Sequence, residues 1–298
     1  MLGYPKNLYI LPLDHRDFLV KILFGLKGAL NVKDHRLMEK YRELVFDGFY
    51  AAYKKLNNKP ELAILVDEEF GSSVLNSARK KKIVFCLSTE KSGQSGFTLE
   101  YGRDFGKHIE KFHPPIVKAL VRYNPANIQV NRIQLKRLKQ LSDWCHTYGY
   151  KFLLEPLVPP TVADLEKCHG RQDLFDKNIR PRLAQTMVKE TQLSGVEPDI
   201  WKIEAFESTK DWEKIIPVIR RGQSRSEVGI VLLGRNASFA QVKRWFNLAP
   251  REQLNGFAVG RTVFLRAVEE FYAKKINRPA AVKIIADNYA ELVRYWTK

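Results

Sequence analysis

Residues 199–204 of this 298-residue chain read Asp-Ile-Trp-Lys-Ile-Glu, an apolar run with a lysine near its centre. The run follows the turn signal Gly-Val-Glu-Pro at residues 195–198, which predicts a short buried strand. Strand alternation places Lys202 and Glu204 on one face and their apolar neighbours on the other. Such a lysine is held in an ion pair, lies at a strand end with its ammonium group in water, or is used chemically. The chemical use arises because a desolvated lysine loses its proton more readily, and a neutral amine attacks ketones.

Seven further short apolar runs recur along the chain, separated by helical segments. The eight predicted strands lie at residues 9–13, 62–66, 83–87, 116–121, 152–154, 199–204, 228–233 and 256–259. Helical periodicity occurs at residues 39–55, 131–148, 181–193, 207–220 and 239–246. Continuous apolar runs are typical of strands buried on both faces of a parallel sheet, and the glycine-rich fingerprint of a dinucleotide-binding open sheet is absent. The pattern therefore predicts a single (β/α)8 TIM barrel domain of the α/β class over residues 1–298.

The composition is that of an ordinary globular protein, with 45% apolar and 28% charged residues. No run reaches the roughly 18 apolar residues of a membrane span, and residues 1–16 show no signal-peptide pattern. The cysteines, Cys86, Cys145 and Cys168, are few and are spaced neither as a disulfide framework nor as a metal site. We therefore expect a cytoplasmic protein with no membrane partner.

The formal net charge of +17 is the one extreme value of the composition. Because the charges are scattered, a solvated basic surface explains them as well as attraction of anionic partners does. Nucleic-acid binding would require a recognisable module or basic patches interleaved with aromatic residues, and neither is present. We expect a small anionic metabolite rather than a nucleic acid as the partner, and the sequence leaves a homo-oligomer open.

In a (β/α)8 barrel the active site lies at the C-terminal ends of the strands. Almost every predicted strand here ends in charged residues. These are Asp14, His15 and Arg16; Asp67 and Glu69; Glu90 and Lys91; Lys118 and Arg122; Glu155; Lys202 and Glu204; Arg235; and Arg261. The set is cationic with carboxylates interspersed, which predicts a phosphorylated or carboxylated substrate.

Two lysines are expected to share this mouth. Period-two spacing aligns Lys118 with Arg122, so Lys118 and Lys202 point into one pocket from the fourth and sixth strands. A second cation is one way to depress the pKa of a nucleophilic lysine. Alternatively, Lys118 pairs with Glu155 or Glu90. Glu155 is the candidate general acid or base, or it balances the charge of the lysines.

The last two strands end in Gly234-Arg235 and Gly260-Arg261, where these barrels commonly bind phosphate. Glycine allows backbone N–H groups to approach the ligand, and arginine adds bidentate recognition. His15 is expected to orient the substrate, to shuttle a proton, or merely to be hydrogen-bonded. No spacing typical of metal ligands is found, so we expect neither a metal nor another cofactor.

Six segments together resemble the DUF2090 family. They are Asp14-His15-Arg16 and residues 66–71, 90–94, 117–125, 196–204 and 256–263. That family includes the aldolase-like C-terminal domain fused to the sugar kinase of bacterial myo-inositol catabolism. It is more distantly similar to class I tagatose-1,6-bisphosphate and sulfofructose-phosphate aldolases. The resemblance extends from about residue 9 to residue 295.

The resemblance implies a class I aldolase in which Lys202 is the Schiff-base lysine. The substrate it implies is 2-deoxy-5-keto-gluconate 6-phosphate, cleaved to dihydroxyacetone phosphate and malonate semialdehyde. Arg235 and Arg261 would then hold the phosphate, and Arg16 or Arg122 the carboxylate. Residues 205–206 and 236–238 depart from the glycines expected there. An aldolase for another phosphosugar or sulfosugar therefore remains an alternative, as does a non-catalytic barrel that binds anions or nucleic acid.

Overall fold

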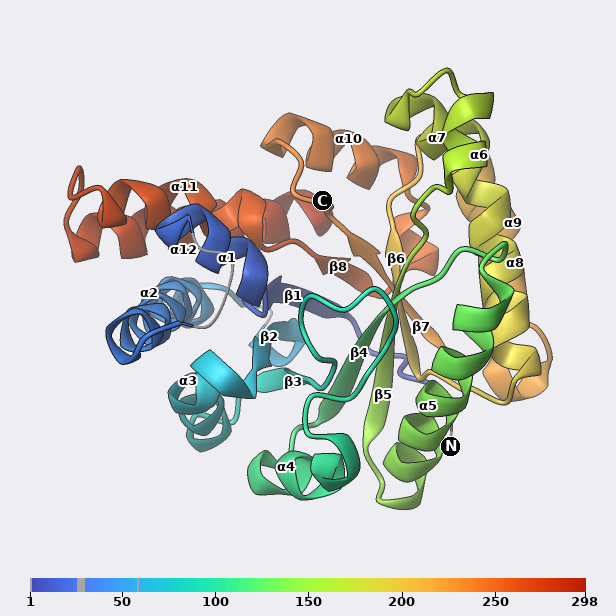
Figure 1. Cartoon of the computed structure of the whole chain (residues 1–298). Helices are drawn as coiled ribbons and strands as arrows, with labels where there is room; N and C mark the ends of the chain where they lie inside the picture. Colours follow the sequence, from blue (N-terminus) through green and yellow to red (C-terminus); the bar gives the residue numbers. More distant parts are fainter. Residues whose placement is uncertain (1, 26–29, 58) are drawn as a thin grey trace.

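The computed structural model describes residues 2–25, 30–57 and 59–298. Eight parallel strands pair in sequence order and close into a barrel, with β1 against β8 (Figure 1). The strands are β1 (Leu8–Pro12), β2 (Leu62–Asp67), β3 (Val84–Ser88), β4 (Ile116–Arg122), β5 (Lys151–Leu157), β6 (Ile200–Glu204), β7 (Gly229–Leu233) and β8 (Gly256–Ala258). All eight predicted strands are present, and the predicted (β/α)8 fold is confirmed.

Helices surround the barrel (Figure 1). They are α1 (Arg16–Phe24), α2 (Val32–Lys55), α3 (Glu68–Lys80), α4 (Phe105–Phe112), α5 (Ile128–Thr147), α6 (Val162–Lys167), α7 (Gln172–Asn178), α8 (Arg180–Leu193), α9 (Thr209–Ile219), α10 (Phe239–Leu248), α11 (Arg261–Tyr272) and α12 (Arg278–Trp296). α2 begins seven residues before the predicted helix, because the Asn31 side chain accepts a hydrogen bond from the Asp34 N–H and caps its first turn. Within the described residues, no helix is both long and apolar enough to cross a membrane.

The strands carry two kinds of inward-facing residue. The lower interior is an apolar cluster of Leu8, Ile10, Ala63, Leu65, Cys86, Ile116, Leu153, Ile200, Val231 and Ala258. Two residues further along β4, β5 and β6, the same inward face carries Lys118, Glu155 and Lys202. The outward residues, such as Trp201 and Ile203, pack in the larger cluster between the strands and the helices. The barrel thus changes from an apolar plug to a charged layer within one pleat, and the charged layer lies at the C-terminal mouth.

Close backbone approach accompanies the closure of the barrel. Gly256, at the start of β8, has a φ of +144°, and a Cβ there would lie 2.2 Å from the Leu8 carbonyl oxygen of β1. An L-residue with a side chain fits neither that dihedral nor that space. The glycine is therefore required where the last strand meets the first.

Candidate active site

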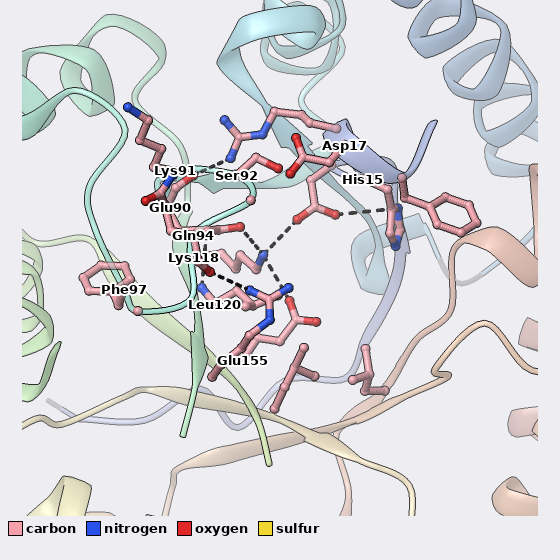
Figure 2. A pocket seen from close by; sticks show the side chains of 18 of the residues that line it. His15, Asp17, Glu90, Lys91, Ser92, Gln94, Phe97, Lys118, Leu120 and Glu155 are labelled. Atoms are coloured by element: carbon pink, nitrogen blue, oxygen red, sulfur yellow. Dashed lines mark hydrogen bonds and ion pairs between the residues drawn. The ribbon is translucent and has the colours of Figure 1, made fainter. Parts of the chain in front are cut away.

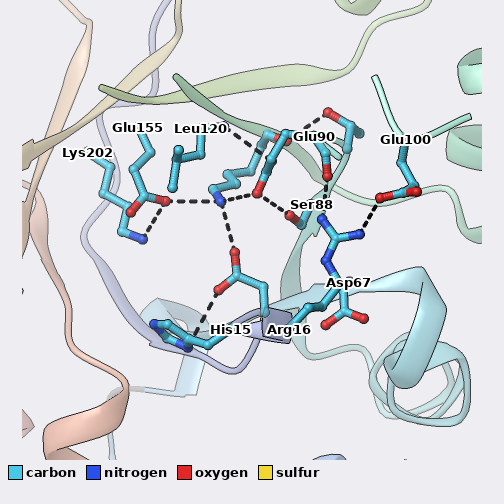
Figure 3. A network of polar contacts seen from close by, with 12 residues as sticks. His15, Arg16, Asp67, Ser88, Glu90, Glu100, Leu120, Glu155 and Lys202 are labelled. Atoms are coloured by element: carbon cyan, nitrogen blue, oxygen red, sulfur yellow. Dashed lines mark hydrogen bonds and ion pairs between the residues drawn. The ribbon is translucent and has the colours of Figure 1, made fainter. Parts of the chain in front are cut away.

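Two buried lysines meet at one carboxylate at the mouth of the barrel. Lys202 Nζ lies 2.8 Å from Glu155 Oε2, and Lys118 Nζ lies 3.1 Å from the same oxygen (Figure 3). The two lysine side chains are only 2% and 0% exposed. The three strands are adjacent, and their register places Glu155 opposite Leu120, two residues beyond Lys118 along β4. The structure therefore joins the three residues predicted to be catalytic in one ion-pair cluster.

Lys118 is surrounded by carboxylates. Its Nζ lies 2.8 Å from Asp14 Oδ2 and 2.6 Å from Glu90 Oε1, in addition to Glu155. Burial alone lowers the pKa of Lys118, but the charges of Asp14, Glu155 and Glu90 raise it well above that of a free lysine. Lys118 is therefore a permanent ammonium group. Lys202, among the described residues, has an ion pair with Glu155 alone.

The carboxylates of this cluster are held in their ionised form. Burial by itself raises the pKa of Glu155, but Lys118 and Lys202 lower it below the ordinary range. The pKa of Asp14 is likewise raised by burial and lowered overall, chiefly by Lys118. At neutral pH both groups are charged and accept protons or hydrogen bonds.

A cavity of about 410 Å³ opens above this cluster (Figure 2). The predicted site residues that line it are Asp14, His15, Arg16, Glu90, Lys91, Lys118, Arg122, Glu155, Glu204, Arg235 and Arg261. Lys202 contributes no surface to the lining, and its partner Glu155 does. Within the described part of the chain, no group of three or more His, Cys, Asp or Glu side chains is placed to hold a metal ion.

Two arginines at the mouth are already neutralised by carboxylates of the protein. Arg16 Nη1 lies 2.5 Å from Glu100 Oε2 and 3.7 Å from Glu69 Oε2. Arg235 lies 3.0 Å from Glu204 Oε1 and 2.8 Å from Asp176 Oδ2. These pairs fix the wall of the cavity and leave little net charge for an anionic ligand.

Three other cations of the lining have no carboxylate partner among the described residues. Arg261 stacks on the Phe18 ring, 4.4 Å from its centroid, and Arg122 donates only to the Gln94 carbonyl oxygen at 3.2 Å. Lys91 lines the cavity and has an exposed side chain. Arg261 follows β8, whereas Lys91 follows β3 and Arg122 ends β4, so they lie on opposite sides of an eight-stranded mouth. The free positive charge is therefore divided between two ends of one cavity.

His15 is a neutral ring at this mouth. Its side chain is 22% exposed, and its Nδ1 lies 4.0 Å from Asp14 Oδ1 without a hydrogen-bond partner among the described residues. Burial lowers the pKa of His15 to about 3, with Arg261 and Lys202 acting in the same direction and Asp14 opposing them. At neutral pH this ring is an uncharged donor and acceptor.

Besides Lys202, three residues predicted to contact the substrate, Asp67, Gly234 and Gly260, do not line the cavity. The Asp67 carboxylate is fully buried, lies 2.9 Å from Arg42 Nη2, and accepts the Phe70 N–H at the start of α3. A Cβ on Gly234 would lie 2.8 Å from Val259, and one on Gly260 would lie 2.4 Å from the Pro12 carbonyl oxygen. In this structure Asp67 therefore pairs with Arg42 and caps α3, and the two glycines permit close packing at the strand ends.

The turn after β7 contains Arg235 and Asn236 in the backbone conformation that glycine usually adopts. Arg235 and Asn236 both have a left-handed backbone, with φ of 46° and 61°. Such conformations cost about 1 kcal/mol or more for a non-glycine residue. Two carboxylates hold the Arg235 side chain in this turn. Asn236 lies in the stretch 236–238 where a glycine is expected, and it adopts a left-handed conformation itself.

The loop between β3 and α4 supplies lining residues that the sequence analysis did not single out. Ser92, Gln94 and Phe97 line the cavity. Gln134 of α5, 1% exposed, holds this loop by accepting the Phe97 N–H at 3.2 Å and donating to the Arg122 carbonyl oxygen at 3.0 Å. The sequence signal that could have indicated this loop contact is a polar residue, Gln134, at a core-facing position of the predicted helix.

The fold and the site define a (β/α)8 barrel with a buried lysine–carboxylate cluster beneath a cavity lined by charged side chains. The chain belongs to the DUF2090 family, described as an uncharacterized protein conserved in bacteria, whose model matches residues 3–298. No curated protein matches the sequence.

Solved structures share the fold at low sequence identity. Fructose-bisphosphate aldolase from Plasmodium falciparum, in complex with TRAP and a small-molecule inhibitor, superposes with a TM-score of 0.65 at 14% identity, covering 97% of this chain and 90% of that one. A protein of Corynebacterium glutamicum gives 0.60 at 16% identity, covering 98% and 87%. An archaeal fructose 1,6-bisphosphate aldolase gives 0.55 at 10% identity, covering 96% and 95%. At these identities the likeness shows a common fold.

Proposed function

We propose that this protein is a class I aldolase, a carbon–carbon lyase that forms a Schiff base through Lys202. The observation that carries the proposal is a buried lysine on a barrel strand, 2.8 Å from Glu155, with the permanent charge of Lys118 on the other side of that carboxylate. An amine, a proton acceptor beside it and a fixed cation are the parts that Schiff-base chemistry needs. The fold shared with aldolases supports the same class.

In the proposed reaction, Lys202 passes a proton to Glu155, and its neutral amine attacks the substrate ketone. The carbinolamine takes the proton back from Glu155 and loses water, which leaves an iminium ion. A carboxylate then removes the proton of the hydroxyl group β to the iminium carbon, the adjacent carbon–carbon bond breaks, and its electron pair forms an enamine while an aldehyde departs. Protonation of the enamine carbon and hydrolysis release the ketone product and restore Lys202. Lys118 keeps Glu155 ionised between these steps.

The distribution of free cations supports a substrate with an anion at each end. Arg261, at the start of α11, suits a phosphate, because helix N-termini and arginine both favour that group. Lys91 and Arg122 suit a second anion on the opposite side of the mouth. Arg16 and Arg235 are left to shape the wall, because carboxylates already neutralise them.

The substrate we propose is 2-deoxy-5-keto-gluconate 6-phosphate, which has a phosphate at one end and a carboxylate at the other. Cleavage between its third and fourth carbons gives malonate semialdehyde and leaves dihydroxyacetone phosphate on Lys202 as the enamine. Another phosphosugar or sulfosugar with two anionic ends would use the same cations. A panel of such ketoses, assayed for release of dihydroxyacetone phosphate, identifies the substrate.

Borohydride trapping tests the class of enzyme. The protein, incubated with dihydroxyacetone phosphate and sodium borohydride, is expected to gain one reduced adduct, which peptide mass spectrometry locates on Lys202. Lys202→Ala should abolish the adduct, and substitution of the exposed Lys283 should leave it intact. Absence of an adduct, or an adduct that survives Lys202→Ala, overturns the proposal.

The assignment of the two anion sites has its own measurement. Arg122→Ala is expected to raise KM for the doubly anionic substrate about tenfold or more, since a charge-assisted contact contributes about 1.5–3 kcal/mol. Proton exchange on dihydroxyacetone phosphate, which lacks the second anion, should change little in this variant. Arg261→Ala should weaken both reactions. If Arg122→Ala affects both equally, Arg122 does not bind the far anion.

A further inference from the structure

The N-terminal half of α5 has its polarity inverted. Asn131 and Gln134 are 4% and 1% exposed, whereas Ile128 and Ile133 are 71% and 56% exposed. A surface helix normally buries its apolar stripe. The buried amides are explained by their contacts with the loops after β3 and β4. The described part of the chain offers no comparable contact for the exposed side chains of Ile128 and Ile133, and Ile128 lines a groove.

Helices α5 and α8 lie on the same side of the barrel (Figure 1). A groove of about 610 Å³ runs between α5 and the C-terminal end of α8, and it shares no lining residue with the cavity at the mouth. Besides the buried Asn131, the α5 residues that line it are Ile128, Arg132, Leu135, Lys136 and Lys139. They follow the i, i+4, i+7, i+8, i+11 spacing of one helical face. Leu193, the last residue of α8, lines the opposite wall and is 84% exposed. The groove therefore combines apolar surface with a row of cations.

The positive charges that line this groove are only partly paired with carboxylates among the described residues. Arg132 and Lys136 have no ion pair among the described residues, and Lys139 pairs with Asp143 at 2.7 Å. The one acidic residue of the lining, Glu190, accepts the Tyr123 hydroxyl at 2.5 Å. A ligand of this groove gains most if it brings apolar side chains together with carboxylates.

We propose that the groove between α5 and α8 docks an acidic amphipathic helix of a partner protein. The wall residues recur at helical spacing, so a helix lying along α5 places apolar residues at i, i+3, i+4 and i+7 against Ile128, Leu135 and Leu193. Its acidic flank then faces Arg132 and Lys136. A second copy of this chain is disfavoured as the occupant, because its own equivalent face would bring the same cations together and its net charge is +17.

A fluorescent peptide tests the proposal on the full chain. The probe is a peptide of about 18 residues, with leucines at helical spacing and glutamates at the other positions. A matched peptide with lysines in place of the glutamates is the control for charge. We expect fluorescence anisotropy to give a Kd of about 10–100 μM for the acidic peptide, as is usual for small interfaces, and no saturation for the basic one.

Substitutions of exposed residues locate the binding site. Ile128→Asp and Arg132→Glu should each weaken binding at least about fivefold, the ratio that about 1 kcal/mol produces. Val162, which is 75% exposed on α6 and outside the groove, provides the matched control Val162→Asp, which should leave Kd unchanged. All three variants should unfold at the wild-type temperature, since exposed substitutions disturb folding little.

Three results overturn the proposal. The acidic peptide fails to bind at 1 mM, or it binds the wild type and Ile128→Asp equally, which shows attraction to the net charge alone. In the third, sedimentation shows a wild-type dimer that Ile128→Asp dissociates, and a second copy then occupies the groove.

Discussion

Replacement of Lys118 by methionine isolates the charge balance of the cluster at the mouth. Methionine keeps the length and apolar stem of the side chain but removes the ammonium group that three carboxylates share. Glu155 keeps Lys202 as a partner, and Glu90 keeps the Ser88 hydroxyl at 2.7 Å. Asp14 is left with only the neutral His15, 4.0 Å away. The substitution therefore leaves two buried carboxylates, Asp14 and Glu90, without an ion pair among the described residues, at 8% and 12% exposure.

The expected cost follows from that count. Removing one partner of a buried ion pair costs about 3–5 kcal/mol. Both orphaned carboxylates line the cavity, and Glu90 keeps a hydroxyl donor, so Lys118→Met is expected near the lower end, at about 3 kcal/mol. In a chain of this size that loss corresponds to a fall in Tm of about 6 °C. Adding Asp14→Asn removes one of the two orphaned charges, so the double variant should regain about 1–2 kcal/mol.

The cost of Lys118→Met is expected to depend on pH. In the wild type, Lys118 lowers the pKa of Asp14, so the stability from this pair is complete above pH 4 and is lost only as the pH falls below it. The raised pKa of Lys118 keeps its contribution complete until the pH exceeds that of free lysine. In the variant, burial without a cation raises the pKa of Asp14, and the native state takes up a proton as the pH falls. The difference between the two proteins should therefore shrink from pH 8 to pH 5.

Urea unfolding followed by tryptophan fluorescence at pH 8 and pH 5 measures both effects. Lys283→Met is the control, since Lys283 is 76% exposed in its pair with Asp287 and should cost less than about 0.5 kcal/mol. A loss below about 1 kcal/mol for Lys118→Met, equal at both pH values, would refute the argument that Lys118 neutralises buried charge.

Three further predictions concern single residues. The Cε1 proton resonance of His15 should keep the position of a neutral ring down to pH 5, because the pKa of His15 in the folded protein is about 3. This pKa lies below the unfolded value, so the stability that the neutral ring contributes is complete above pH 6.5 and is lost as the pH falls towards 3. His15→Asn should reduce that pH-dependent loss in urea unfolding. Arg42→Met leaves the buried Asp67 carboxylate without its ion pair, so the free energy of unfolding should fall by about 3–5 kcal/mol. The KM of the remaining folded enzyme should stay at the wild-type value. Gly256→Ala places a Cβ 2.2 Å from a β1 carbonyl oxygen and should cost more than about 2 kcal/mol in thermal unfolding, whereas Gly102→Ala, with φ of +51° and nothing within 4 Å, should cost about 1 kcal/mol.

The sequence predicted the barrel because its signal is local. Each strand is a short apolar run that ends in charged residues. Because side chains of a strand alternate between its two faces, the spacing alone predicts that Lys118 and Lys202 point into the barrel. The helix bounds were less accurate, since the start of α2 depends on a capping side chain at Asn31 outside the apolar pattern.

The pairing of charges at the mouth was beyond sequence reasoning. Arg16 meets Glu100 across 84 residues, and Arg235 meets Asp176 across 59 residues. No local pattern indicates which arginine is neutralised by such a distant carboxylate and which stays free for a ligand. The same is true of Asp67 at the end of β2, whose partner Arg42 lies in α2, 25 residues earlier. The composition and the strand ends predict that cations gather at the mouth. The three-dimensional structure is needed to distinguish the arginines that are paired with carboxylates from the cations that are available to a ligand.

The unequal surroundings of the two lysines decide their roles under the proposed chemistry. Lys118 contacts three carboxylates and cannot release its proton near neutral pH, whereas Lys202 contacts one carboxylate whose negative charge Lys118 already offsets. An iminium ion on Lys202 keeps the positive charge of the lysine from which it forms, so Glu155 faces a cation before and after the covalent step. The charge that Glu155 faces is then the same before and after the covalent step, which is one part of electrostatic preorganisation. A borohydride adduct found on Lys118 instead of Lys202 would reverse this division of roles.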